Sequence, residues 1–195
     1  MLKKIIIDTD PAMGTKGGDP EDCFAIMMAL NSPELEILGI TAVQGNVPVE
    51  RGYSNAHYLV NHFGKDVPIR SGPSNTYDEL RNKDRIWLSQ RDEMEQLTPM
   101  VSKPYDEEDA ADFICKTALE HSGELELVTI GPLTNIAFAL DKQQDLKKHI
   151  TKITMMAGAA KIPGNITPCA EFNVWADPEA ADKVFQSGIP LAMIP

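Results

Sequence analysis

Strand-like and helix-like segments alternate along almost the whole chain. Residues 3–8 form a short β-branched run, and residues 19–30 follow with apolar side chains at helical spacing. The same alternation predicts further strands at 35–43, 67–70, 124–130, 150–156 and 190–194, and further helices at 49–63, 107–120, 133–140 and 177–186. Parallel strands need long crossover connections, which are usually helices. The pattern therefore predicts an α/β fold with a mostly parallel, open, Rossmann-like sheet and helices on both faces.

A polar stretch at about 71–105 interrupts the alternation. It is rich in charged residues and has no clear periodicity, as is typical of functional lids and of loops without regular structure. Trp87 within it either covers a ligand or, as the more common role, anchors the loop to the body of the protein. With this loop included, residues 1–195 have the length of a single α/β domain.

Charge and cysteine content exclude several classes of protein. A net charge of −11 argues against a nucleic-acid partner, because phosphate binding needs clustered Lys and Arg. Cys23, Cys115 and Cys169 are widely spaced, which favours free thiols and a cytoplasmic location over a disulfide framework. The amino terminus, MLKKIIIDTD, has an apolar run too short for a signal peptide or a membrane span, so we expect no membrane partner.

Acidic residues gather just after the first predicted strand. Asp8, Asp10, Asp19, Glu21 and Asp22 fall within fifteen residues, and Asp8 and Asp10 point to the same side of an extended segment. Such acids repel one another when they are close, and a hard cation such as calcium or magnesium relieves the repulsion. The simpler alternative for Asp19 and Asp22 is that they favour the start of a helix. That alternative does not explain Asp10.

Amide and acidic side chains follow other predicted strands. Asn46 comes after the second strand, and Asn165, Glu171 and Asn173 come after a later one. In parallel α/β sheets, ligands bind outside the carboxyl ends of the strands, where such side chains meet. A single asparagine there is more often a turn former, but several beside an acidic cluster indicate a site for a polyol such as a sugar.

Four ordered motifs carry a specific resemblance. They are IIIDTDP at 5–11 with EDCFAI at 21–26, ITAVQGN at 40–46, IGPLTNIA at 130–137, and the segment 165–180 that contains AEFNVWADPEAA. Their order and approximate spacing resemble those of the inosine-uridine-type nucleoside hydrolases. The resemblance implies the fold of that family and hydrolysis of the N-glycosidic bond of ribonucleosides by a calcium-bound water, in purine or pyrimidine salvage.

The resemblance also implies roles for individual residues. Asp10 would be a Ca²⁺ ligand and the general base for the attacking water, with Asp22 and the carbonyl of Ile130 as further ligands. Asn46 would lie near that water. The residues implied to contact ribose are Glu21, Met156 at the floor of the sugar site, Asn165, Glu171 and Asn173.

The chain departs from the family pattern in three places. The loop before Glu21 is longer than usual, so either Glu21 or Asp19 contacts ribose. No histidine lies between positions 71 and 105, where the family has one, so the preferred nucleobase is not implied. Family members continue well beyond this length, so we expect a C-terminally truncated relative. Such a chain is either an active hydrolase or a non-catalytic nucleoside- or ribose-binding remnant, with a partner or a homo-oligomer completing its exposed edge.

A second enzyme class shares the apolar strand that ends in Asp-x-Asp. In a magnesium-dependent phosphatase of the haloacid dehalogenase type, Asp8 would be the nucleophile and Asp10 the general acid and base. Pro11 replaces the glycine-threonine continuation that is usual in that class, and no downstream lysine or acidic pair is suitably placed, which counts against this interpretation.

Overall fold

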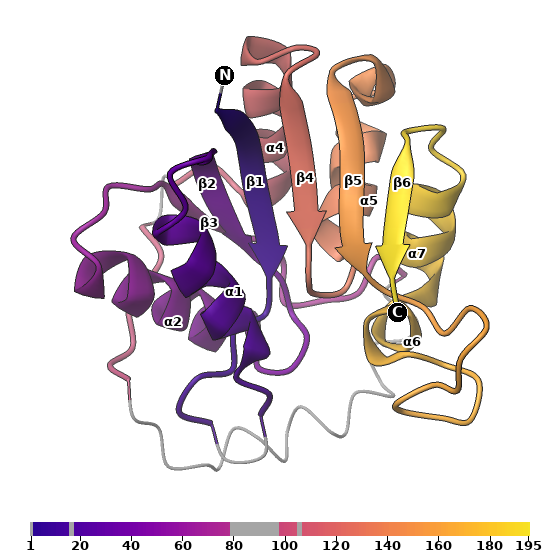
Figure 1. Cartoon of the computed structure of the whole chain (residues 1–195), viewed down its shortest axis with the longest axis horizontal. Helices are drawn as coiled ribbons and strands as arrows, with labels where there is room; N and C mark the ends of the chain where they lie inside the picture. The colour runs from indigo at the N-terminus through magenta and orange to yellow at the C-terminus, as the bar shows by residue number, and fades with distance from the viewer. Residues whose placement is uncertain (1, 16–17, 79–97, 105–106) are drawn as a thin grey trace.

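The computed structural model describes residues 2–15, 18–78, 98–104 and 107–195, and it is built on a parallel sheet. The sheet has the strand order β3-β2-β1-β4-β5-β6. Its strands are β1 (Lys3–Thr9), β2 (Leu35–Ala42), β3 (Ile69–Ser71), β4 (Leu125–Thr129), β5 (Ile150–Met156) and β6 (Leu191–Ile194). Every neighbouring pair is parallel, and the arrowheads of β1, β4, β5 and β6 in Figure 1 point the same way. The predicted α/β fold with a parallel sheet is therefore confirmed.

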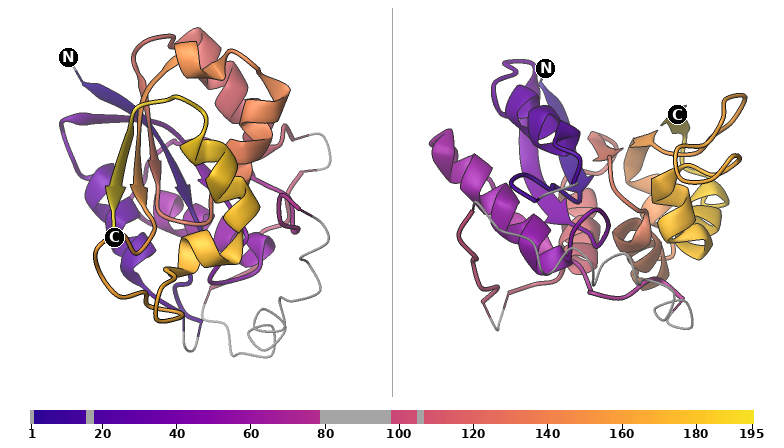
Figure 2. Two further views of the ribbon diagram at one scale, coloured as in Figure 1. Left: turned by 90° about the vertical axis from the view of Figure 1, so that its right-hand side faces the viewer. Right: turned by 90° about the horizontal axis from the view of Figure 1, so that it is seen from below.

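Helices cover the sheet from both sides. They are α1 (Glu21–Leu30), α2 (Val49–His62), α4 (Ala110–Glu120), α5 (Thr134–Lys142), α6 (Phe172–Ala176) and α7 (Pro178–Phe185), with a short 3-10 helix, η2 (Leu146–Lys148). Figure 2 shows α1 and α2 on one side of the sheet and α4, α5 and α7 on the other. The side chains of β1 account for this arrangement, because residues along a strand alternate between its faces. Ile5 and Ile7 pack with α1 and α2, whereas Ile6 packs with α4 and α5.

Each face of the sheet has its own apolar core. Fully buried Leu127 and Ile136 belong to the α4, α5 and α7 side, and fully buried Ile26 and Ile40 belong to the α1 and α2 side. Burying a side chain of this size contributes about 1.5–3 kcal/mol. The two cores hold β1 in the middle of the sheet, and its carboxyl end is therefore a rigid place for functional side chains.

Helix boundaries differ from those predicted by up to three residues. The first helix begins at Glu21 rather than Asp19, with Pro20 as the residue before it. The helix predicted from residue 107 begins at Ala110, because the Asp109 carboxylate accepts a hydrogen bond from the backbone N–H of Asp112 at 2.8 Å. The last predicted helix begins one residue later than expected, since Asp177 caps it. Aspartate favours this position because its carboxylate satisfies a free N–H of the first turn.

The third strand and the polar loop also need correction. The predicted strand at 67–70 is β3 at Ile69–Ser71, and the helix α6 was not predicted at all. Of the polar stretch, residues 71–78 and 98–104 are described, and Trp87 lies outside the described residues. In the ranges that the structure describes, no helix combines the length and the apolar character needed to cross a membrane.

Candidate functional site

One small pocket at the carboxyl edge of the sheet gathers the predicted site residues. Its lining side chains come from the segments that follow β1, β2, β4 and β5: Asp19, Glu21, Asp22, Asn46, Ile130, Met156, Asn165, Glu171, Phe172 and Asn173. Sequence reasoning had singled out all of these except Phe172. That residue stands between Glu171 and Asn173 in the fourth motif, and its place there is the only signal that pointed to it. Segments that are far apart in the sequence therefore meet at this pocket. The chemical roles of their residues remain predictions.

Asp10 is not among the residues that line this pocket, but it is completely buried and contacts two of them, Asp22 and Asn46. Its Oδ2 accepts a hydrogen bond from the backbone N–H of Asn46, and its Oδ1 has no hydrogen-bond partner among the described residues. Two glycines make room for the carboxylate. A Cβ at Gly45 would lie 1.9 Å from Asp10 Oδ2, and a Cβ at Gly131 would lie 2.9 Å from Asp10 Oδ1. Only a residue without a side chain permits such a close approach of the backbone.

Asp22 is held against the end of β1. Its Oδ2 accepts hydrogen bonds from the hydroxyl of Thr9 at 2.7 Å and from the backbone N–H of Asp10 at 3.0 Å. Thr9 was not predicted as a functional residue. The contact joins β1 to the first turn of α1, across the loop whose length departs from the family pattern.

Burial and repulsion act on this pair of acids together. Desolvation raises the pKa of Asp10, and the neighbouring charge of Asp22 raises it further. Burial also raises the pKa of Asp22, while hydrogen bonds from Asp10 and Thr9 oppose that increase. Two buried carboxylates without a counter-charge are unfavourable, and a divalent cation beside them removes the penalty.

The donor set fits a hard cation such as calcium. It consists of the unpartnered Asp10 Oδ1, the Asp22 carboxylate and the Ile130 carbonyl, which are the oxygen ligands that calcium prefers. Within the described ranges, no group of three or more acidic, histidine or cysteine side chains is arranged to hold a metal. Two carboxylates and one carbonyl are fewer than the six to eight oxygens that calcium usually takes, so water or substrate oxygens would have to complete the set.

The Ile130 carbonyl has a side-chain partner already. Asn173 Nδ2 donates to Ile130 O at 3.1 Å and to Met156 O at 3.0 Å. These carbonyls follow or end the adjacent strands β4 and β5. A carbonyl oxygen has two lone pairs, so the bond to Asn173 leaves Ile130 O able to bind a cation.

Two predicted ribose contacts also organise the loop that carries them. The Glu171 carboxylate accepts hydrogen bonds from the backbone N–H groups of Gly158, Asn173 and Val174, at 2.9, 2.6 and 3.1 Å. Asn165 Oδ1 accepts one from the N–H of Phe172 at 2.8 Å. Both side chains line the pocket, but some of their acceptor oxygens already bind backbone N–H groups of the protein.

Asp8 does not line this pocket. Its Oδ1 accepts hydrogen bonds from the Thr41 hydroxyl and from Asn135 Nδ2, the latter at 2.8 Å, and burial raises its pKa to about 7. A nucleophile must reach its substrate, whereas neither Asp8 nor the two residues that bond its carboxylate, Thr41 and Asn135, line the pocket. This placement argues against the phosphatase interpretation, in which Asp8 attacks a phosphoryl group.

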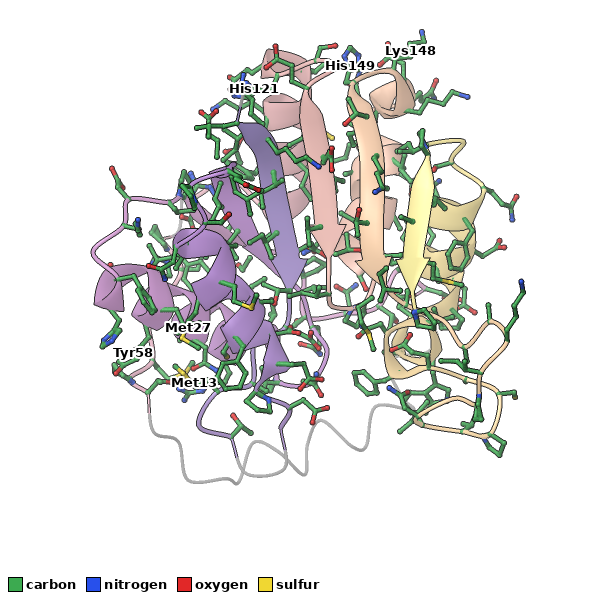
Figure 3. The ribbon with its side chains drawn as sticks, viewed as in Figure 1. Met13, Met27, Tyr58, His121, Lys148 and His149 are labelled. Atoms are coloured by element: carbon green, nitrogen blue, oxygen red, sulfur yellow. The ribbon has the colours of Figure 1, made fainter. Side chains whose placement is uncertain are left out.

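Other features of the molecule lie away from the pocket. A hollow of about 790 Å³ between α5 and α7 is much larger than the site, which encloses about 40 Å³, but it contains none of the predicted site residues. Figure 3 shows His121, Lys148 and His149 at the amino edge of the sheet, opposite the site. His121 and His149 therefore lie away from the pocket.

The family model, the curated relative and the solved structures to which this chain is similar are all described as nucleoside hydrolases or nucleosidases. Residues 5–195 match the family model described as inosine-uridine preferring nucleoside hydrolase. Uridine nucleosidase 1 of Arabidopsis thaliana is 36% identical over 98% of this chain and 56% of the plant protein.

Solved structures agree with the sequence match. A plant nucleoside hydrolase superposes with a TM-score of 0.82 at 32% identity, over 100% of this chain and 60% of the plant chain. A purine-preferring ribonucleoside hydrolase from Gardnerella vaginalis gives a TM-score of 0.79 at 35% identity, over 98% and 60% of the two chains. The chain thus spans 56–60% of the length of these relatives.

Proposed function

Since this chain belongs to the inosine-uridine preferring nucleoside hydrolase family, we propose that it hydrolyses the N-glycosidic bond of ribonucleosides, with Ca²⁺ at the Asp10 and Asp22 site. The products are the free base and ribose. The proposed setting is purine or pyrimidine salvage in the cytoplasm. The chain spans only 56–60% of the length of its relatives, so its own hydrolase activity is a proposal that has to be tested on this chain.

The observation that carries the proposal is the buried pair of acids under the pocket. Asp10 offers one carboxylate oxygen that no described group hydrogen-bonds, and Asp22 lies next to it with the same charge. Amide and acid groups suited to vicinal hydroxyls line the space above them. A site for a divalent cation beside a site for a sugar is an arrangement that supports water attack on an anomeric carbon.

Asp10 is the proposed general base. Asp10, Asp22 and the Ile130 carbonyl would hold calcium, which would supply Lewis-acid activation of the attacking water. The Asp10 carboxylate would accept the proton of the attacking water, and the backbone N–H of Asn46 keeps the carboxylate in position. A general base contributes roughly 10²–10⁴-fold to the rate.

The remaining pocket residues act on the sugar. Cleavage passes through an oxocarbenium-like state, in which positive charge develops at the ring. Asn165, Glu171 and Asn173 bind the ribose hydroxyls above the floor formed by Met156, and nearby carboxylates stabilise the developing charge. Either Asp19 or Glu21 contacts a further hydroxyl, since both are exposed and both line the pocket.

The preferred base is left open in this proposal. The similar proteins include a uridine nucleosidase and a purine-preferring hydrolase, at 36% and 35% identity. Both purine and pyrimidine nucleosides are therefore included as substrates in the test.

The test measures ribose release from inosine, adenosine, uridine and cytidine by this chain, in calcium and after chelation. We expect release in calcium, and we expect Asp10→Asn to lower it by about 10²–10⁴-fold. Asp66→Asn is the matched control, because Asp66 is exposed and lies in the loop before β3, away from the site. Calorimetric titration with calcium and with ribose runs beside the activity assay.

Three results would change the conclusion. Release that is equal with and without calcium would refute the role of the cation. Full activity of Asp10→Asn would refute its role as the base. Binding of calcium and ribose without any turnover would replace hydrolysis by the non-catalytic alternative, a nucleoside- or ribose-binding protein.

A further inference from the structure

Asn173 uses its amide nitrogen on the protein backbone. The nitrogen donates to the carbonyls of Ile130 and Met156, at 3.1 and 3.0 Å. The nitrogen also contacts Met156 Sδ at 3.2 Å, and since a side-chain amide nitrogen has only two hydrogens, these acceptors use its full donor capacity. Only Oδ1 of this side chain remains for a ligand, and the nitrogen holds the end of β4 at a fixed distance from the end of β5.

Thr9 acts in a similar way on the opposite side of the site. Its hydroxyl donates to Asp22 Oδ2 at 2.7 Å, and the hydroxyl is completely buried at the end of β1. The backbone N–H of Asp10 donates to the same oxygen at 3.0 Å. With Oδ2 held by two donors, the rotation of the Asp22 carboxylate is restricted, and Oδ1 is the oxygen left for a cation.

We propose that Thr9 and Asn173 are positioning residues that fix two of the oxygen ligands of the cation, Asp22 and the Ile130 carbonyl, before the cation binds. This inference rests on the proposed function, because it takes these oxygens as cation ligands. It assigns to Thr9 a role that the motifs do not indicate. It also adds to the predicted ribose contact of Asn173 a second role that operates without any sugar.

The physical basis is the cost of ordering ligands. A carboxylate or a loop carbonyl that moves freely must lose that freedom when a cation binds, and groups that order it beforehand reduce the loss. Side chains that orient metal ligands in this way typically contribute 10–100-fold to metal affinity. Thr9 and Asn173 come from β1 and α6, and they act on ligands from α1 and from the segment after β4, so their effects are separable.

The test is calorimetric titration of calcium into the whole chain in the absence of any nucleoside or ribose. Thr9→Val keeps the shape of the side chain and removes only the hydroxyl, and Asn173→Leu removes the amide at similar size. We expect each variant to bind calcium about 10–100-fold more weakly than the wild type. Thr9→Ser restores the hydroxyl and is expected to restore most of the affinity.

Matched controls carry the same chemical changes at the amino edge of the sheet. Thr151→Val removes a hydroxyl that donates to Leu125 O, and Asn31→Leu removes an amide that donates to Met27 O. Neither lies near the pocket, so both should bind calcium as the wild type does. Thermal unfolding is measured for every variant, because a purely structural role would lower the melting temperature and leave the calcium affinity of the folded protein unchanged.

The outcomes separate this inference from the function on which it rests. If the wild type binds calcium and the folded Thr9→Val and Asn173→Leu variants bind it equally well, positioning is refuted and the proposed function stands. If the wild type itself does not bind calcium, the proposed metal is refuted and the inference with it. Should Asn173→Leu fail to fold, Thr9→Val and Thr9→Ser still decide whether positioning occurs.

Discussion

Replacing Gly45 by alanine tests how tightly the backbone encloses the Asp10 carboxylate. The added Cβ would lie 1.9 Å from Asp10 Oδ2, 2.6 Å from Asp10 Cγ and 2.8 Å from Pro132 Cδ. Gly45 is not one of the glycines with a positive φ, so alanine adopts its backbone conformation without strain. The effect of the substitution is therefore steric, and it acts directly on the proposed catalytic base.

The size of the effect follows from these contacts. Real Cβ atoms do not approach other atoms to 1.9 Å, so the Asp10 side chain must move, and the buried Pro132 ring limits where the new methyl group fits. Overpacking of this kind costs about 1–3 kcal/mol. For a chain of this size each kcal/mol lowers the melting temperature by about 2–4 °C, which gives a decrease of about 2–12 °C. Movement of Asp10 also breaks its bond with the N–H of Asn46 and weakens calcium binding.

The assay is thermal unfolding together with calcium titration, and Gly52→Ala is the matched control. A Cβ at Gly52 would have its nearest neighbour at 3.5 Å, which is ordinary contact. Gly52 lies inside α2, where alanine is favoured over glycine by about 0.8–1 kcal/mol, so the control should unfold at the same or a higher temperature. If Gly45→Ala melts like the wild type and binds calcium as tightly, the inference that the backbone at Gly45 leaves no room for a Cβ beside Asp10 is refuted.

Two further predictions concern buried acids outside the pocket. Burial raises the folded-state pKa of Asp8 from 3.8 to about 7, so the metal-free folded chain keeps a proton that the unfolded chain loses. Its free energy of unfolding should therefore fall as pH rises from about 4 to 7, and urea titrations should show a smaller fall in Asp8→Asn; an unchanged slope would exclude Asp8 as a source. Asp177→Ala removes the acceptor for the Thr134 hydroxyl and the Ala180 N–H, and the lost cap and unpaired donors should cost at least about 2 kcal/mol in urea unfolding. Asp182→Ala, on the exposed side of the same helix, should change stability by about 0.5 kcal/mol or less, and equal losses in the two variants would contradict the role of Asp177.

The fold was predictable because its signals are local. Isoleucine-rich runs such as the one in β1 alternate with helical segments, and this pattern identified a parallel sheet before any contact was known. Boundaries were less predictable. Helix α6 has only five residues, and it begins where Glu171 caps it with a carboxylate, a bond that periodicity does not report.

The position of the site was predictable for the same reason. Residues that follow parallel strands must come to one edge of the sheet, so Asp22, Asn46, Ile130 and Asn173 were expected together, and the pocket contains all four. The role of each residue was a different matter, since it came from a resemblance and not from the pattern. Phe172 was not predicted as a site residue, because an aromatic residue in a motif can equally pack in the core or line a pocket.

By itself, the sequence determined the fold class, the edge of the sheet that carries the site and the acids that gather there. Only the tertiary structure decided which of those residues lie beside the pocket. Asp8 and Asp10 are two residues apart and have the same chemistry, and each keeps one oxygen without a partner in the described part of the chain. Asp8 is bound by Asn135, which is 127 positions away and does not line the pocket, whereas Asp10 is bound by the backbone N–H of Asn46, which does. The physical reason is that hydrogen bonds are made over about 3 Å in space, while a sequence pattern records only distances along the chain.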